Sequence, residues 1–214
     1  MKLVLQNAIT FAAKWQEDFR QWDVIDYDFT RGDGTITRVE MMTSIRHAPY
    51  TVSEGWRGVR LDYADGELAA FVLIPDDDIE QVTPTMLRQA VSRLCRPNET
   101  IGFVLTRLPR FTVATSKDLV DLFTAIGVEH GMDRAMTTDL PTIPTQAKQQ
   151  AIIVVDEQGT VVSTVTIICM GIDIPHWAEE PIDIMANRPF YFIVGDVETG
   201  TPLFLSHIGD PKMA

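Results

Sequence analysis

The sequence has few basic residues and no run of them. Eighteen Lys and Arg stand against 30 Asp and Glu, which gives a formal net charge of −12 at pH 7. A surface for nucleic acid or an anionic membrane needs clustered cations to contact phosphate groups. The composition therefore argues against both partners and favours proteins or small molecules.

Cysteine and long apolar runs are also scarce. The two cysteines, Cys95 and Cys169, lie in no CxxC or Cys/His spacing, so neither a zinc site nor a disulfide framework is expected. No apolar run approaches the roughly 20 residues of a membrane span, and the Met1 end lacks the layout of a secretion signal. The sequence therefore leaves the cellular compartment open.

The common catalytic and cofactor motifs are missing. There is no GxSxG, Walker loop, GxGxxG or HExxH, and the acidic run at 76–78 lacks the alternate spacing of a calcium loop. Isolated histidines are usually surface or satisfied core residues, and the four here are scattered singly: His47, His130, His176 and His207. We therefore expect no metal, no cofactor and no enzymatic activity.

The sequence does contain strong hairpin signals. With 45% hydrophobic residues, 214 residues can bury a core of one large or two small domains. Strand-like runs flank Asp33-Gly34, Asp65-Gly66 and Glu198-Thr199-Gly200, and each turn favours a β-hairpin. Two further apolar runs, 3–13 and 149–159, are typical of buried strands.

Two helices are expected among these strands. The first begins at Thr83-Pro84 and carries an apolar stripe at Met86, Leu87, Ala90, Val91 and Leu94. The second follows a strand over 102–115, opening at Ser116 and closing at Gly127. The pattern predicts an α+β fold with mainly antiparallel sheets and few helices.

Five separated stretches follow one another in the order of one known family. The first, "LVLQNAITFAAKWQEDF", has Asn7, Trp15 and Phe19 at positions typical of the family. The last, "IMANRPFYFIV", resembles the family signature after the reactive loop, with Asn187 and Pro189 followed by Phe190. Between them lie "GVRLDYADGELAAFVLIPDDD", "RLPRFTVATSKDLVDLFTAIGV" and the hinge-like "VVDEQGTVVSTVT". Together, these five stretches resemble the serpins, the serine protease inhibitor family.

The resemblance implies a protease inhibitor that acts as a suicide substrate. A target protease cuts an exposed reactive loop, here about 157–180, and the hinge then inserts as a strand between the strands of 3–13 and 149–158. The resemblance places the hinge at Glu157, Gly159, Thr160, Val162, Thr164 and Thr166. It places the region where the sheet opens at Asn7, Trp15 and Gln149, although the family often has histidine at the position of Gln149.

The bond that a protease would cut stays open between two readings. The family's usual spacing from Gly159 leads to Asp173-Ile174, which suits an aspartate-preferring protease, whereas Met170 or Ile172 suits elastase-like, chymotrypsin-like or subtilisin-like enzymes. No Lys or Arg occurs from 150 to 187, so trypsin-like targets are not expected.

The resemblance covers only the C-terminal part of a single serpin domain, over residues 1–214. The family's N-terminal helical half has no counterpart here, so exposed strand edges favour self-association. The hinge from 161 to 165 is bulkier than the alanine-rich hinges of inhibitory members. Two alternatives therefore stand beside inhibition: a non-inhibitory serpin-like binding protein, or an inactive truncated remnant. An extracellular location is compatible with the family.

Overall fold

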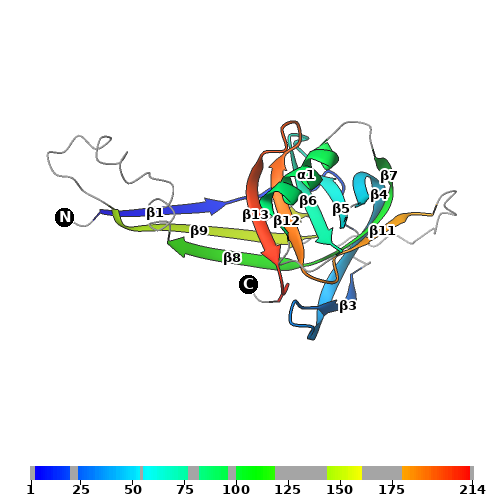
Figure 1. Ribbon diagram of the computed structural model, residues 1–214, viewed down its shortest axis with the longest axis horizontal. Helices are drawn as coiled ribbons and strands as arrows, with labels where there is room; N and C mark the ends of the chain where they lie inside the picture. Colours follow the sequence, from blue (N-terminus) through cyan, green and yellow to red (C-terminus); the bar gives the residue numbers. More distant parts are fainter. Residues whose placement is uncertain are drawn as a thin grey trace. The chain divides into compact units, whose positions relative to one another are not determined.

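The chain forms two compact units, shown in a computed structural model (Figure 1). One unit comprises residues 1–11 and 113–153, and the other comprises 12–112 and 154–214. The structure describes the following parts of the chain: 3–19, 24–53, 55–76, 82–95, 100–118, 144–160 and 180–212.

The first unit is built on a parallel strand pair. Strand β1 (Leu3–Thr10) runs beside β9 (Pro144–Asp156), from Leu3 opposite Pro144 to Thr10 opposite Ile152. Strand β8 (Phe111–Asp118) also pairs with β9. The strands predicted within 3–13 and 149–159 are confirmed, although a parallel pairing was not part of the prediction.

The second unit contains an eight-stranded sheet in the order β11-β7-β4-β5-β6-β12-β13, with β3 paired to β4. All pairs are antiparallel except β11 with β7. The strands are β3 (Ile25–Thr30), β4 (Ile36–Ser53), β5 (Trp56–Asp62), β6 (Leu68–Pro75), β7 (Ile101–Pro109), β11 (Ile182–Met185), β12 (Phe190–Asp196) and β13 (Pro202–Ile208).

The three predicted hairpins are confirmed as β3–β4, β5–β6 and β12–β13. Each turn contains a glycine with positive φ, at Gly34 (82°), Gly66 (73°) and Gly200 (69°). Because glycine adopts this conformation without steric cost, the local sequence was enough to locate the turns.

The predicted first helix is confirmed as α1 (Pro84–Cys95). The hydroxyl of Thr83 accepts a hydrogen bond from the Met86 N–H at 3.3 Å, as expected of an N-terminal cap. Part of the apolar stripe is buried with strand side chains in one core, whose buried members are Trp56, Ala69, Phe71, Leu73, Ala90, Val91, Leu94 and Ile193.

The predicted start of the second helix is wrong. Ser116 lies inside β8, which continues to Asp118, so pairing with β9 prevails there over the local capping signal. Residues 119–127, the rest of that predicted helix, lie outside the described residues. Among the described helices, none is long and apolar enough to cross a membrane.

Candidate functional site

The predicted hinge begins with a tight hairpin in the second unit. Strand β9 ends at Asp156, and after two residues β10 (Gly159–Thr160) returns antiparallel to it. The Asp156 carboxylate accepts hydrogen bonds from the N–H groups of Gln158 (2.9 Å) and Gly159 (3.2 Å). The turn predicted at 157–159 is therefore confirmed.

Strand β10 is an interior strand, because it pairs with β9 on one edge and with β2 (Ala13–Lys14) on the other. Gly159 has a φ of 154°, and a Cβ at this position would come within 2.1 Å of the Ala13 carbonyl oxygen. Only glycine fits this close approach of two backbones.

A buried hydroxyl pair fixes the end of β10. Thr160 is fully buried, and its Oγ1 lies 2.9 Å from the Tyr63 hydroxyl. Tyr63 directly follows β5, in the β5–β6 hairpin. Burial raises the pKa of Tyr63 well above its ordinary value, so the phenol is neutral and serves as a hydrogen-bond partner.

Trp15 and Phe19 hold the turn from the other side. The backbone N–H groups of these residues donate to the carbonyls of Gln158 (3.0 Å) and Glu157 (2.9 Å), and the Trp15 indole donates to the Asp156 carbonyl (2.9 Å). The indole also stacks on Tyr63, with ring centroids 4.8 Å apart. All three turn carbonyls are therefore bound by one segment of the chain.

An ion pair anchors the side chain of Glu157. The Arg110 Nε donates to Glu157 Oε1 at 2.6 Å, and Arg110 Nη1 donates to Glu40 Oε2 at 2.7 Å. The Glu157 side chain is 7% exposed and that of Glu40 57%. Burial lowers the pKa of Arg110, but the hydrogen bonds to Glu157 and Glu40 outweigh this and raise it above its ordinary value.

The other predicted site residues fall into two groups. In the first unit, Asn7 lies directly opposite Gln149 in the β1–β9 register, whereas Trp15 belongs to the second unit. The remaining hinge residues and the candidate cleavage positions lie outside the described residues; these are Val162, Thr164, Thr166, Met170, Ile172, Asp173 and Ile174.

Two residues of this site were not predicted as functional. Tyr63 is 97 positions from Thr160, and Arg110 is 47 positions from Glu157. Arg110 follows Leu108-Pro109 inside one of the family-like stretches, and this was the only indication in the sequence that Arg110 could belong to the site. Nothing in the local pattern around Tyr63 indicates its partner.

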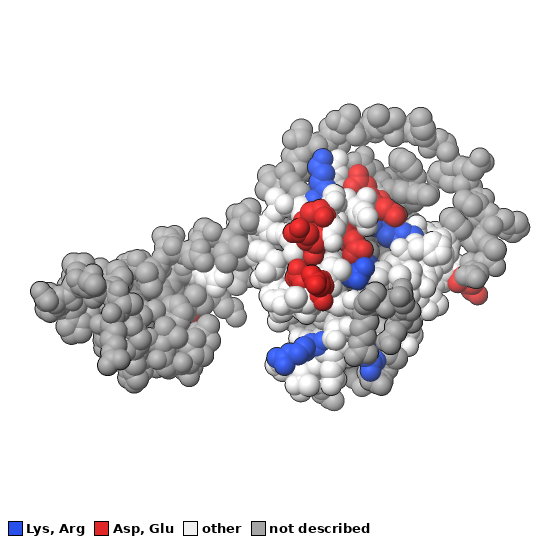
Figure 2. All heavy atoms as spheres, turned by 90° about the horizontal axis from the view of Figure 1, so that it is seen from above, with Lys and Arg blue, Asp and Glu red and all other residues white. Residues whose placement is uncertain are grey.

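The surface charge follows the composition. On the face in Figure 2, acidic side chains of the described residues gather with only a few basic ones between them. The described residues on that face form no continuous basic surface for phosphate groups.

Comparison with known proteins gives one consistent family. The model for "Serpin (serine protease inhibitor)" matches residues 1–211. Alpha-1-antiproteinase 2 of Equus caballus is 28% identical over 222 aligned positions, covering 98% of this chain and 50% of the relative. A serpin-like protein of Thermococcus kodakarensis is 27% identical, covering 99% of this chain and 50% of its own length.

A solved structure shares the fold. Serpin48 of the insect Tenebrio molitor, described as highly specific, aligns with a TM-score of 0.76 at 21% identity. The alignment covers 97% of this chain and 56% of that protein. The chain thus spans about half the length of the relatives it matches.

Proposed function

The chain belongs to the serpin family of serine protease inhibitors, and from this premise we propose that it carries the trapping half of a suicide-substrate inhibitor. A target protease cuts the reactive loop, and the hinge then inserts as a new strand. The attacking nucleophile belongs to the protease, so the proposed role requires no catalytic group from this chain.

The observation that carries the proposal is the position of β10. Its two residues already pair with β9 and β2, and Thr160 is fully buried. The loop that follows is held at its far end by β11, which pairs with β7. Residues 161–181 therefore connect two strands that each belong to a sheet, and a cut between them would free the hinge to move.

Strand pairing gives the insertion a direction. A strand that continues β10 along β9 would run antiparallel to β9, and also antiparallel to β1, because β1 and β9 are parallel. Insertion would replace one parallel pairing by two antiparallel ones, which are slightly more stable per residue. Serpin loop insertion is itself a known example of such strand addition.

The loop sequence supports insertion over a limited length. After Thr160 the next charged residue is Asp173, so twelve uncharged residues follow the buried end of β10. On the proposed reading, Val162, Thr164 and Thr166 continue the face of Thr160, since alternate residues of a strand share a face. A charge or a proline among them would oppose burial in the sheet.

The target follows from the side chain before the cut. The loop has no Lys or Arg, so the proposed targets are not trypsin-like. Two cleavage sites remain: the Asp173-Ile174 bond for an aspartate-preferring protease, or a bond after Met170 or Ile172 for an enzyme that prefers apolar residues.

The exposed edge of β13 supports self-association as a further property. In the described residues β13 pairs only with β12, and Leu203 and Leu205 are 55% and 56% exposed. Such an edge can pair with another chain. Sedimentation velocity at increasing protein concentration tests this, and a constant monomeric mass would contradict it.

The decisive experiment incubates the full chain with elastase, subtilisin and an aspartate-specific protease, followed by denaturing gels and mass spectrometry of the released peptide. We expect a complex that survives denaturation and a peptide whose N-terminus identifies the cut bond. The Thr160→Arg variant should be cut without forming a complex, whereas Thr85→Arg, on the exposed start of α1, should behave like the wild type.

Other outcomes point to the alternatives. Cleavage of the wild type without a complex, and without a gain in thermal stability, would favour a non-inhibitory binding protein. Aggregation or loss of fixed tertiary structure in the purified chain would favour an inactive remnant.

A further inference from the structure

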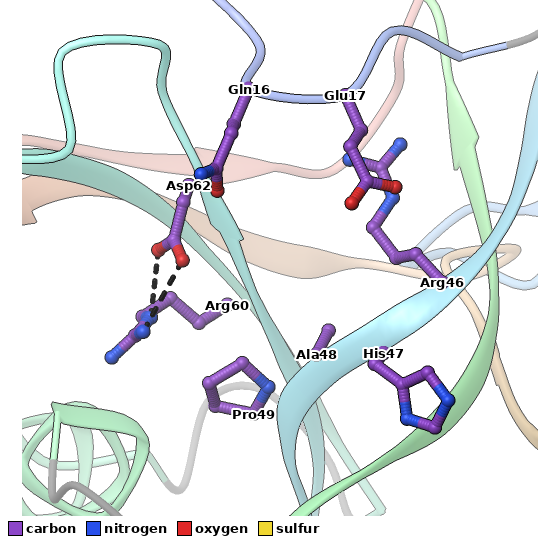
Figure 3. A pocket seen from close by; sticks show the side chains of 8 residues that line it. All are labelled: Gln16, Glu17, Arg46, His47, Ala48, Pro49, Arg60 and Asp62. Carbon is purple, nitrogen blue, oxygen red and sulfur yellow. Dashed lines mark hydrogen bonds and ion pairs between the residues drawn. The ribbon is translucent and has the colours of Figure 1, made fainter.

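A small pocket lies in the second unit (Figure 3). The segment after β2 provides Gln16 and Glu17, strand β4 provides Arg46, and β5 provides Arg60 and Asp62. The pocket holds about 30 Å³ and is partly open to solvent. This is room for about two groups the size of a water molecule.

One side of the pocket is formed by an ion pair. Arg60 Nε lies 2.8 Å from Asp62 Oδ1, and Arg60 Nη1 donates to the Leu94 carbonyl at 3.0 Å, at the end of α1. The charges of Arg60 and Asp62 therefore compensate each other, and this pair forms a wall of the pocket (Figure 3).

The other side holds a buried cation with a free donor. Arg46 is 8% exposed, its Nε donates to Ser44 Oγ at 2.7 Å, and its Cζ lies 5.0 Å from the centre of the Phe19 ring. Its Nη2 is buried and has no hydrogen-bond partner among the described residues. A buried donor without an acceptor is destabilising, so Nη2 is a strong candidate to bind a ligand.

A carboxylate on the same side supplies the complementary group. Figure 3 shows the Glu17 carboxylate and the Arg46 guanidinium on one side of the pocket, opposite Arg60 and Asp62. Within the described part of the chain, Glu17 forms no ion pair, and its side chain is exposed. Burial lowers the pKa of Arg46, and the charges of Glu17, Asp18 and Asp62 act against this shift.

These charges select the ligand. Two arginines and two carboxylates line the pocket together with His47, and the charges of the arginines and carboxylates cancel. A simple anion would be attracted by Arg46 but repelled by Glu17. A simple cation would be attracted by Glu17 but repelled by Arg46. A ligand that carries both charges on neighbouring atoms satisfies both residues and keeps the pocket neutral.

We propose that this pocket binds the head group of an α-amino acid. The ligand carboxylate accepts a hydrogen bond from Arg46 Nη2, and the ligand ammonium donates to Glu17. The pocket has room for one carboxylate oxygen and the ammonium nitrogen, and the rest of the ligand would extend through the open side. This site is independent of the proposed inhibitory function.

Isothermal titration of the full chain with glycine, the smallest such ligand, tests the proposal. Acetate, methylammonium and acetamide serve as probes that carry only one charge or none. We expect saturable binding of glycine and at least tenfold weaker binding of each probe. Glu17→Gln should weaken glycine binding at least tenfold, and Glu67→Gln, an exposed carboxylate outside the pocket, should leave it unchanged.

The Arg46→Met variant should also lose glycine binding. If this core substitution prevents folding, Glu17→Gln decides the question, because an exposed side chain can be changed without disturbing the core. Absence of saturable glycine binding to the wild type would overturn the proposal. Binding of acetate or acetamide as tight as that of glycine, or unchanged glycine binding in Glu17→Gln, would also overturn it.

Discussion

The carboxylate of Glu157 accepts a hydrogen bond from Arg110 Nε at 2.6 Å, and the Glu157 side chain is only 7% exposed. Arg110 lies between β7 and β8, and Glu157 lies in the turn between β9 and β10. The ion pair thus attaches the side chain of this turn to a residue 47 positions away in the sequence. Trp15 and Phe19 attach the backbone of the same turn.

The first prediction concerns this ion pair. Glu157→Gln removes a buried charge and leaves Arg110 with only Glu40, so we expect the free energy of unfolding to fall by about 2 kcal/mol. Glu40→Gln removes an exposed partner of the same arginine and should cost no more than about 0.5 kcal/mol. Chemical denaturation of both variants measures the contrast, and equal losses would show that burial of Glu157 is unimportant.

The second prediction concerns the hydroxyl pair. Thr160→Val and Tyr63→Phe each remove the hydrogen bond between the two buried hydroxyls, so each should cost about 1–2 kcal/mol of unfolding free energy. The double variant removes both hydroxyls and should cost less than the sum of the two single changes. A double-mutant cycle measures this coupling, and additive costs would mean that the two hydroxyls do not stabilise each other.

The local elements of the fold could be predicted from sequence, because short-range chemistry determines them. The turns at Gly34 and Gly66 require positive φ, and the helix at Pro84 begins with a capping threonine. The helix expected from Ser116 failed for the opposite reason: the capping signal is local, whereas β8 is held by a partner strand that is distant in sequence.

The site itself depends on contacts that no local pattern indicates. The resemblance proposed Glu157 and Thr160 as hinge residues, but their partners, Arg110 and Tyr63, become neighbours only in the folded chain. The parallel pairings of β1 with β9 and of β11 with β7 were missed for the same reason. A strand's own sequence reports which faces are buried, but it does not identify the neighbouring strand.

The third prediction concerns the close approach at Gly159. Gly159→Ala places a Cβ within 2.1 Å of the Ala13 carbonyl oxygen, so β10 must leave its position between β9 and β2. We expect a loss of at least about 2 kcal/mol of unfolding free energy and faster proteolysis near the hinge. Gly34→Ala is the control, because its turn has positive φ but open space, and it should cost only about 1 kcal/mol.

The fourth prediction concerns acid stability. Burial raises the pKa of Asp210, but the N–H of Lys212 and the ion pair with Arg31 outweigh it and hold the pKa below its ordinary value. A depressed carboxyl pKa stabilises the fold above the unfolded-state value of about 3.9, and this contribution disappears as the pH falls through the folded-state pKa. Asp210→Asn should therefore lower stability at neutral pH, and the difference from the wild type should shrink in acid. Denaturation curves from pH 7 down to about pH 3 measure this difference, and a constant difference would contradict the assignment.

The fifth prediction tests where the hinge inserts. Asn7 and Gln149 are direct partners on the parallel strands β1 and β9, and adjacent strands lie about 4.8 Å apart, within reach of a disulfide. A variant with cysteine at both positions, and with Cys95 and Cys169 replaced by serine, should lock these strands together when oxidised. If trapping requires a new strand between β1 and β9, the oxidised protein should be cut by the target protease without forming a stable complex.

Reduction of the same sample should restore the complex, which makes each preparation its own control. Equal trapping in both redox states would mean that the cleaved hinge does not separate these two strands, and the insertion proposed here would have to follow another path.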